Sequence, residues 1–273
     1  MTIIQAIILG IVQGLTEFLP ISSSAHLVLV PYIFEWDLAS AEAFLFDVLV
    51  QLGTLAAVIV YFWKDLIAII KSVLSGIKAK QPLKESDSIL GWMIILATIP
   101  AGLGGILLKD YVETAFSSPV ITAVMLFITA ALMTISEWVS KKTREIETIK
   151  PKEALLIGFF QMLAIFPGIS RSGATISGGL IQNFDRKGSA RFSFLMSIPI
   201  MLAAGLLALV DLIKMSSLFS FLPVLVIGFL IAGVVGYFSI AWLMRFLKKS
   251  SLYVFSLYCV LVSILILILH NVR

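Results

Sequence analysis

The sequence predicts an all-α polytopic membrane protein with six transmembrane helices and two re-entrant helical hairpins in an inverted-topology repeat. The 273 residues are 60% hydrophobic and only 13% charged, whereas soluble domains carry about 25% charged residues. Apolar runs follow one another along the whole chain and leave no room for a soluble domain. We therefore expect a single integral membrane domain over residues 1–273.

Six apolar segments are long enough to cross a bilayer as helices. A helix of about 20 residues rises about 30 Å, which is the thickness of the hydrocarbon layer. We place the spans near residues 44–63, 90–108, 118–139, 192–213, 221–244 and 252–269.

Two further apolar regions are interrupted by turn-forming residues. Each piece is helical in pattern, but at about 10–16 residues, or roughly 15–24 Å, it is too short to span alone. Non-helical backbone occurs within a membrane where protein buries it or where it lines a cavity, so we interpret both regions as re-entrant hairpins. The pieces are 3–18 and 25–34, separated by Pro20 and a serine run, and 153–166 and 174–184, separated by 167–173.

The basic residues predict how these segments are oriented. Four clusters, at 64–84, 141–152, 186–191 and 245–249, hold 16 of the 20 Lys and Arg residues. Cytoplasmic loops are enriched in Lys and Arg, and placing all four clusters inside gives every span a consistent direction. The first hairpin then enters from outside and the second from inside. Because the charges follow this topological pattern, the net charge of +4 does not indicate a nucleic-acid partner.

A weak internal repeat agrees with this opposed arrangement. The Gly-x-x-Gln pattern at 10–13 recurs at 158–161, and Pro20 recurs as Pro167, so the offset stays at 147–148 residues. Each half would contain one hairpin and three spans, and because three is odd the halves would have opposite orientations. The two repeats would cover about 1–140 and about 150–273.

The break in the first hairpin is rich in polar side chains. Gln13 and Glu17 lie four residues apart on one helix face, and together they could hold a divalent cation (Mg²⁺ or Ca²⁺) against phosphate oxygens. His26 is the only histidine in the membrane region and could act as acid, base or nucleophile. An ionisable group in hydrocarbon costs roughly 2.5–3.5 kcal/mol, so we expect these side chains to be functional.

Both breaks also offer an anion site. Each returning helix would begin near the midplane, and helix N-termini attract anions through free N–H groups and the helix dipole. Arg171 adds a guanidinium, which pairs bidentately with phosphate. Hydroxyl groups surround both N-termini, and one serine could be a nucleophile activated by His26. The candidate phosphate contacts are Ser22, Ser24, Ser170, Ser172 and Thr175, which could equally serve only as caps or bond to the backbone.

The two breaks resemble the signature motifs of a known family. Gln-Gly-Leu-Thr-Glu-Phe-Leu-Pro-Ile-Ser-Ser-Ser-Ala-His (13–26) and Pro-Gly-Ile-Ser-Arg-Ser-Gly-Ala-Thr (167–175) are similar to those of undecaprenyl-pyrophosphate phosphatases of the bacitracin-resistance type. The resemblance runs from end to end. It implies dephosphorylation of the C55 lipid pyrophosphate to its monophosphate for cell-wall synthesis, a divalent cation, a bacterial inner-membrane location and a pocket open to the outer face.

The resemblance also suggests roles for individual residues. Glu17, His26 and Arg171 match the family's essential glutamate, histidine and arginine, and Ser23 matches the serine proposed as nucleophile. Many members have a glutamate where this chain has Gln13. An amide keeps an oxygen ligand but loses a charge, so the role of this position in metal binding is open.

Several alternatives remain open at this stage. An inverted-repeat transporter or flippase for a lipid phosphate or another anion would share the broken helices and the midplane anion site. The attacking group could be Ser23, His26 or a metal-bound water. Asp47 and Gln51 could support the site or only the packing. Glycines at 102–105 and 228–236 would suit close helix contacts within one chain or in a homodimer.

Overall fold

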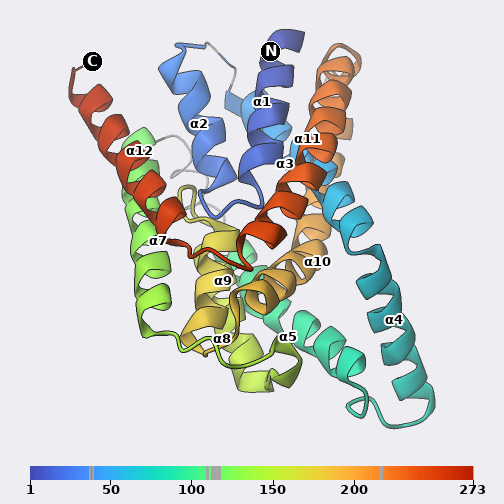
Figure 1. Cartoon of the computed structure of the whole chain (residues 1–273). Helices are drawn as coiled ribbons and strands as arrows, with labels where there is room; N and C mark the ends of the chain where they lie inside the picture. The colour runs from blue at the N-terminus through green and yellow to red at the C-terminus, as the bar shows by residue number, and fades with distance from the viewer. Residues whose placement is uncertain (37, 39, 109–110, 112–117, 215–217, 273) are drawn as a thin grey trace.

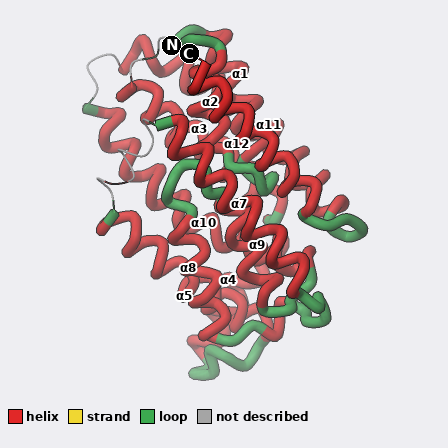
Figure 2. Tube along the Cα trace, turned by 90° about the vertical axis from the view of Figure 1, so that its left-hand side faces the viewer, coloured by secondary structure: helices red, strands yellow, loops and turns green. Residues whose placement is uncertain are grey.

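The computed structural model describes residues 1–36, 38, 40–108, 111, 118–214 and 218–272, and within these ranges the regular elements are helices (Figures 1 and 2). A single isolated bridge joins Arg144 to Phe184. The helices are α1 (Ile3–Thr16), α2 (Ser23–Ile33), α3 (Ser40–Tyr61), α4 (Trp63–Lys78), α5 (Ser86–Leu107), α7 (Pro119–Val139), α8 (Pro151–Leu163), α9 (Arg171–Ile181), α10 (Arg186–Ile213), α11 (Leu218–Phe246) and α12 (Tyr253–Val272), with a short 3₁₀ helix, η1, at Ile146–Thr148.

The predicted class of polytopic membrane protein is confirmed. Among the described residues, five helices are long and apolar enough to cross a membrane, namely α5, α7, α10, α11 and α12. A sixth span is counted if α3 and α4, which meet at a bend of 75°, are taken together. Each of the six predicted spans falls on one of these helices or on α3.

Helix α4 was not predicted from the sequence. The five lysines of residues 64–84 predict only that this segment lies inside, and in the structure 63–78 form a helix of 16 residues. Its apolar residues recur every three or four positions, which is the signal for an amphipathic helix. The lysines between them masked that periodicity.

The two interrupted regions form two pairs of short helices, as the pattern predicts. Helices α1 and α2 lie at one end of the molecule and α8 and α9 lie toward the other, and the turns of both pairs meet in the middle (Figure 1). The turns contain backbone in the left-handed region, at Ser22 (φ 69°) and Gly168 (φ 98°). At Gly168 an added Cβ would also meet the backbone of Thr122, so only glycine fits there.

The first helix of each pair packs closely on a long helix. A Cβ added at Gly10 of α1 would lie 2.9 Å from the carbonyl oxygen of Gly228 on α11. Gly158 of α8 approaches the backbone of Ala97 on α5 in the same way. Small residues allow such backbone contact between membrane helices. The glycines of α11 are therefore used within the chain, whereas Gly102 and Gly105 of α5 have nothing within 4 Å of an added Cβ.

This packing predicts opposite effects for two glycine-to-alanine changes. Gly10→Ala should destabilise the protein by about 1–3 kcal/mol, because the methyl group meets backbone that cannot move aside. Gly102→Ala, the matched control, should be neutral or stabilising by up to about 1 kcal/mol, since alanine favours the helix. Thermal unfolding in detergent measures both. Equal midpoints for the two variants would contradict the close α1–α11 contact.

Candidate active site

The two breaks are built alike. Ser22 precedes α2, and its Oγ accepts a hydrogen bond from the Ala25 N–H at 3.3 Å. Ser170 precedes α9, and its Oγ accepts from the Gly173 N–H at 3.0 Å. Both serines are therefore N-caps, Ser170 with the usual extended backbone and Ser22 with a left-handed one. Ser23 and Arg171 are therefore each the first residue of a returning helix.

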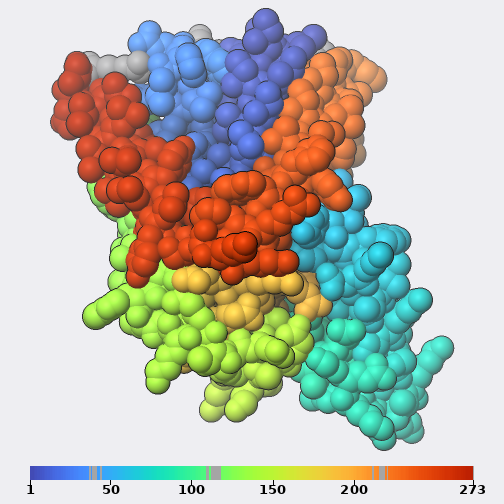
Figure 3. Space-filling model, in the orientation of Figure 1, coloured from blue at the N-terminus to red at the C-terminus, as the bar shows by residue number. Residues whose placement is uncertain are grey.

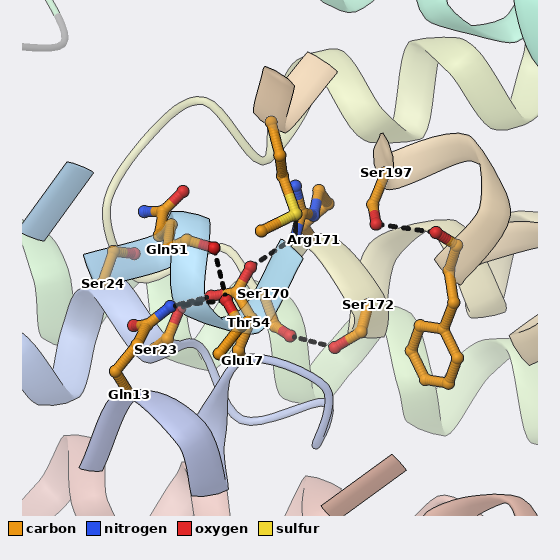
Figure 4. Close-up of polar contacts among 12 residues, drawn as sticks. Gln13, Glu17, Ser23, Ser24, Gln51, Thr54, Ser170, Arg171, Ser172 and Ser197 are labelled. Carbon is orange, nitrogen blue, oxygen red and sulfur yellow. Dashed lines mark hydrogen bonds and ion pairs between the residues drawn. The ribbon is translucent and has the colours of Figure 1, made fainter. Parts of the chain in front are cut away.

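Both of these first residues bind the same carboxylate, that of Glu17 (Figure 4). Arg171 Nη2 donates to Glu17 Oε1 in a short ion pair, and Ser23 Oγ donates to Oε2 at 2.5 Å. Glu17 closes the end of α1 and is only 7% exposed. The structure thus brings together four sequence-predicted residues, since Gln13 Nε2 also donates to Oε2 at 2.8 Å.

The side-chain oxygen of Gln13 is not used as an acceptor by the described part of the chain. Its side chain is fully buried, and Nε2 lies 3.4 Å from Thr54 Oγ1 in addition to its bond to Glu17. Its Oε1 is buried and has no hydrogen-bond partner in the described part of the chain. A buried carbonyl-type oxygen beside a carboxylate suits a hard divalent cation. Among the described residues no group of three His, Cys, Asp or Glu could hold a metal. A divalent cation takes about six or more oxygen ligands, of which Gln13 and Glu17 could supply only a part.

Arg171 keeps donors for a ligand. Its Nη2 contacts Glu17 and the Met201 sulfur, the latter at 3.1 Å. Within the described residues Nε and Nη1 donate no hydrogen bond, and the side chain is about one-fifth exposed. A guanidinium with free donors beside a helix N-terminus is suited to bind a phosphate group.

The hydroxyls around Arg171 are mostly engaged in holding the second break. Ser172 Oγ lies 3.2 Å from the Leu19 carbonyl oxygen and so ties the two breaks together. Thr175 Oγ1 donates to the Arg171 carbonyl at 2.7 Å and lies 2.6 Å from Ser193 Oγ. Ser170 and Ser172 pair through their hydroxyls at 3.1 Å. All three predicted phosphate contacts are thus buried and bonded to protein.

The serines of the first break are arranged differently. The hydroxyls of Ser22 and Ser24 lie 3.2 Å apart. Asp47, one turn from Gln51, is buried and has no hydrogen bond among the described residues. Asp47, Gln51 and Thr54 fall on one face of α3, which extends the polar surface beyond Gln13.

His26 lies outside the hydrogen-bond network of Glu17. Its Nδ1 lies 2.8 Å from the Ser22 carbonyl oxygen, and its Nε2 lies 2.7 Å from the Tyr258 hydroxyl. A carbonyl oxygen only accepts, so Nδ1 carries a proton and in the neutral ring Nε2 accepts from Tyr258. The two rings also stack, with centroids 5.7 Å apart. The Ser22 carbonyl therefore fixes the tautomer of His26, and Tyr258 on α12 helps to hold the orientation of its ring.

Sequence reasoning missed three residues that support the site. Tyr258 orients His26, and Thr54 contacts Gln13. Thr129 of α7 accepts from the Ser170 N–H at 2.9 Å and lies 3.0 Å from the Gly168 carbonyl oxygen, so it holds the second break. Each lies on a different helix and far along the chain from the residue it contacts. No local pattern could have found them.

Taken together, the fold and the site define a polytopic membrane protein with a buried carboxylate, arginine and serine where two broken helices meet. The sequence model of the family described as bacitracin resistance protein BacA matches residues 6–265. The chain belongs to this family, and the resemblance of its two motifs is confirmed.

Curated relatives match this chain over nearly their whole length. An undecaprenyl-diphosphatase of Chlorobium phaeovibrioides is 44% identical over 279 residues, covering 98% of this chain and 97% of that protein. An undecaprenyl-diphosphatase of Chlorobium phaeobacteroides is 44% identical, and the match covers 98% of this chain and 96% of that protein. One of Chloroherpeton thalassium is 42% identical, with the same coverage.

Proposed function

We propose that this protein is a membrane phosphatase that hydrolyses undecaprenyl pyrophosphate to undecaprenyl phosphate and inorganic phosphate. This reaction recycles the lipid carrier of cell-wall synthesis and accounts for resistance to bacitracin. The observation that carries the proposal is the convergence of Ser23 and Arg171, the first residues of two helices, on the single carboxylate of Glu17. These contacts support the roles of Ser23 as nucleophile, Glu17 as its base and Arg171 as the cation that binds phosphate.

Substrate binding follows from the donors around Arg171. The pyrophosphate would replace Glu17 as the partner of the Arg171 guanidinium. The backbone N–H groups in the first turns of α2 and α9 would face the same anion. Ser22, Ser24, Ser170, Ser172 and Thr175 would hold these turns in place or contact the phosphate directly. The prenyl chain would lie in lipid between the spans.

Release of Arg171 frees Glu17 to act as a base. Glu17 takes the proton of Ser23 Oγ while that oxygen bonds to the terminal phosphorus and the bond to the bridging oxygen breaks. Undecaprenyl phosphate leaves, and water then cleaves the phosphoserine to regenerate Ser23. To supply a proton to the leaving oxygen, His26 would first take one from water at Nε2, in place of the hydrogen bond that it accepts there from Tyr258, and would then return to the neutral ring.

A divalent cation, Mg²⁺ or Ca²⁺, would be held by Glu17 and the free Oε1 of Gln13 together with phosphate oxygens. When bound, it would neutralise charge on the pyrophosphate. The buried acceptor of Gln13 supports this assignment.

We further propose the arrangement in the membrane that the sequence predicts. Six spans would cross the bacterial inner membrane, and the α1–α2 and α8–α9 pairs would be re-entrant hairpins of two inverted repeats, with the site open to the outer face. The opposed directions of the two helix pairs (Figure 1) and the parallel roles of Gly10 and Gly158 support the repeat. A homodimer, for which the open glycine face of α5 would be suited, stays a prediction.

The reading as an anion transporter explains less of the site. Transport of an anion needs neither a serine hydroxyl bonded to a buried carboxylate nor a histidine with a fixed tautomer. Phosphate release by purified protein in detergent, where there is no gradient, separates the two functions.

Removing the base or the nucleophile should abolish turnover. We expect Glu17→Gln and Ser23→Ala each to lower kcat by at least about 100-fold, the usual contribution of such groups. Release of phosphate from undecaprenyl pyrophosphate is the measurement. Ser239→Ala, which changes a buried helical serine of α11 bonded to the Val235 carbonyl, is the control and should keep full activity. Substantial activity in Ser23→Ala would show that Ser23 is not the nucleophile and that His26 or water attacks the phosphorus instead.

The metal proposal makes Gln13 a sensitive position. A chelator should abolish activity, and Mg²⁺ or Ca²⁺ should restore it. Gln13→Glu adds a second carboxylate and should tighten metal binding about 10-fold, whereas Gln13→Met should weaken it. Calorimetric titration of the purified protein with the metal and a non-hydrolysable pyrophosphate measures this directly. An unchanged affinity in both variants would remove Gln13 from the metal site.

Tyr258→Phe tests how His26 is held. Phenylalanine keeps the stacked ring but loses the hydroxyl, so kcat should fall about 3- to 10-fold, the equivalent of one hydrogen bond. Tyr253→Phe, on the same helix, should leave the rate unchanged. If His26 is first replaced by alanine, the added loss from Tyr258→Phe should vanish. A loss that persists without His26 would assign Tyr258 to packing alone.

A further inference from the structure

The ends of four long apolar helices meet on one face of the molecule. Helices α7 and α11 end there, and α10 and α12 begin there, and each of the four contains a candidate membrane span. Glu137 near the end of α7 joins these ends, because it accepts from Arg186 Nε of α10 at 2.7 Å and from the Leu252 N–H before α12 at 2.9 Å. Since the apolar spans stop here, we expect this face to lie at the level of the lipid headgroups.

Two aromatic side chains beside these contacts agree with that level. Trp138, in the last turn of α7, is 81% exposed, and Tyr253, the first residue of α12, is 45% exposed. Tryptophan and tyrosine gather where hydrocarbon meets the headgroups. The surface around the helix ends therefore suits contact with lipid.

An open pocket with a volume of about 330 Å³ lies between the helix ends. Three segments of the chain line it, and each includes part of a basic cluster, namely 141–152, 186–191 or 245–249. Figure 3 shows this face of the molecule, with the start of α10 in gold below the end of α11 in orange-red. The lining residues are Lys142, Asp185, Arg186, Lys187, Leu247 and Lys248.

Two cations of the pocket are held on one buried carboxylate. Arg186 binds Glu137 through Nε and Nη2, each at 2.7 Å. Lys142 Nζ lies 3.2 Å from Glu137 Oε2. Within the described residues Arg186 Nη1 donates no hydrogen bond, so a guanidinium donor remains for a ligand. The two cations also exceed the charge of Glu137 by one.

The remaining side chains leave the pocket basic. Lys187 and Lys248 are exposed, and neither forms an ion pair in the described part of the chain. The lining acid Asp185 already accepts from the Gly188 N–H at 2.8 Å. With Glu137 counted, four positive and two negative side chains gather here, which leaves an excess of two positive charges.

We propose that this pocket binds the phosphate group of an anionic phospholipid. Arg186 Nη1, Lys187 and Lys248 would contact the phosphate oxygens, since charged N–H groups form strong hydrogen bonds to phosphate. Basic pockets between membrane helices on the inner side suit acidic headgroups, and the proposed topology places these three basic clusters inside. The lining shares no residue with the Glu17 site, and the inference does not depend on phosphatase activity.

Protection of individual lysines tests the site. The purified full-length protein in detergent is acetylated, and the extent of acetylation at each lysine is read by peptide mass spectrometry. Phosphatidylglycerol should slow acetylation of Lys187 and Lys248 about threefold or more, and it should change little at Lys71 and Lys78, which are exposed on α4. Equal protection of all four lysines would overturn the site.

Two further arms identify the source of the phosphate. Phosphatidylcholine carries a phosphate group but no net charge, so it should protect Lys187 and Lys248 much less than phosphatidylglycerol does. Inorganic phosphate at the same concentration should also protect them little, because it is not concentrated at the detergent surface. Protection by phosphatidylcholine or by inorganic phosphate equal to that by phosphatidylglycerol would overturn the assignment to an anionic lipid.

Lysine variants test the contribution of the pocket to affinity. In Lys187→Gln, Lys248→Gln the dissociation constant for phosphatidylglycerol, measured by native mass spectrometry, should rise at least about 10-fold. Arg186 is kept because it holds Glu137. The matched control, Lys71→Gln, Lys78→Gln, removes the same charge and should change the constant little. Equal effects in the two double variants would show that net charge, and not this pocket, attracts the lipid.

Discussion

The carboxylate of Glu17 is the point on which this structure depends. It receives an arginine from one broken helix and a serine from another, together with a glutamine from its own helix. A carboxylate buried in an apolar protein is tolerated only when charge and hydrogen bonds compensate it. The same contacts also hold the two breaks together. Loss of Glu17 would therefore leave Arg171 without its partner in the middle of the molecule.

Every interruption in the helices has to be satisfied by other parts of the chain, because lipid offers no hydrogen bonds. Ser22 and Ser170 cap the returning helices, Thr129 bonds both sides of the second turn, and Ser172 reaches the first break through the Leu19 carbonyl. Few hydroxyls of the second break remain free. Selectivity for phosphate would accordingly come from Arg171 and backbone N–H groups more than from side-chain hydroxyls.

Much of this architecture was predictable because a membrane makes the sequence unusually informative. Apolar length identified the spans, and Pro20 and 167–173 identified the breaks. Polar residues in these apolar surroundings pointed to Gln13, Glu17, Ser23 and Arg171, which the structure brings together. Residues such as Thr54, Thr129 and Tyr258 were not predictable, because they act across helices and no local pattern marks them. Helix α4 was missed for a different reason, since its lysines hid an amphipathic period.

The proposed repeat implies that the first residues of α2 and α9 descend from one position and have since diverged. Gln13 and Gln161 lie 148 residues apart, as do the first residues of α2 and α9, Ser23 and Arg171, whereas Pro20 and Pro167 lie 147 apart. Glu17, by contrast, falls opposite Ile165, so the acid exists in one half only. A symmetric ancestor made of two identical copies would have carried the same side chain at both helix starts, around a shared axis. Duplication within one gene would have allowed those two positions to diverge, one into a hydroxyl and the other into a cation. Loss of the symmetry between the two helix starts would thus have allowed the Glu17 carboxylate to bind a serine from one half and an arginine from the other.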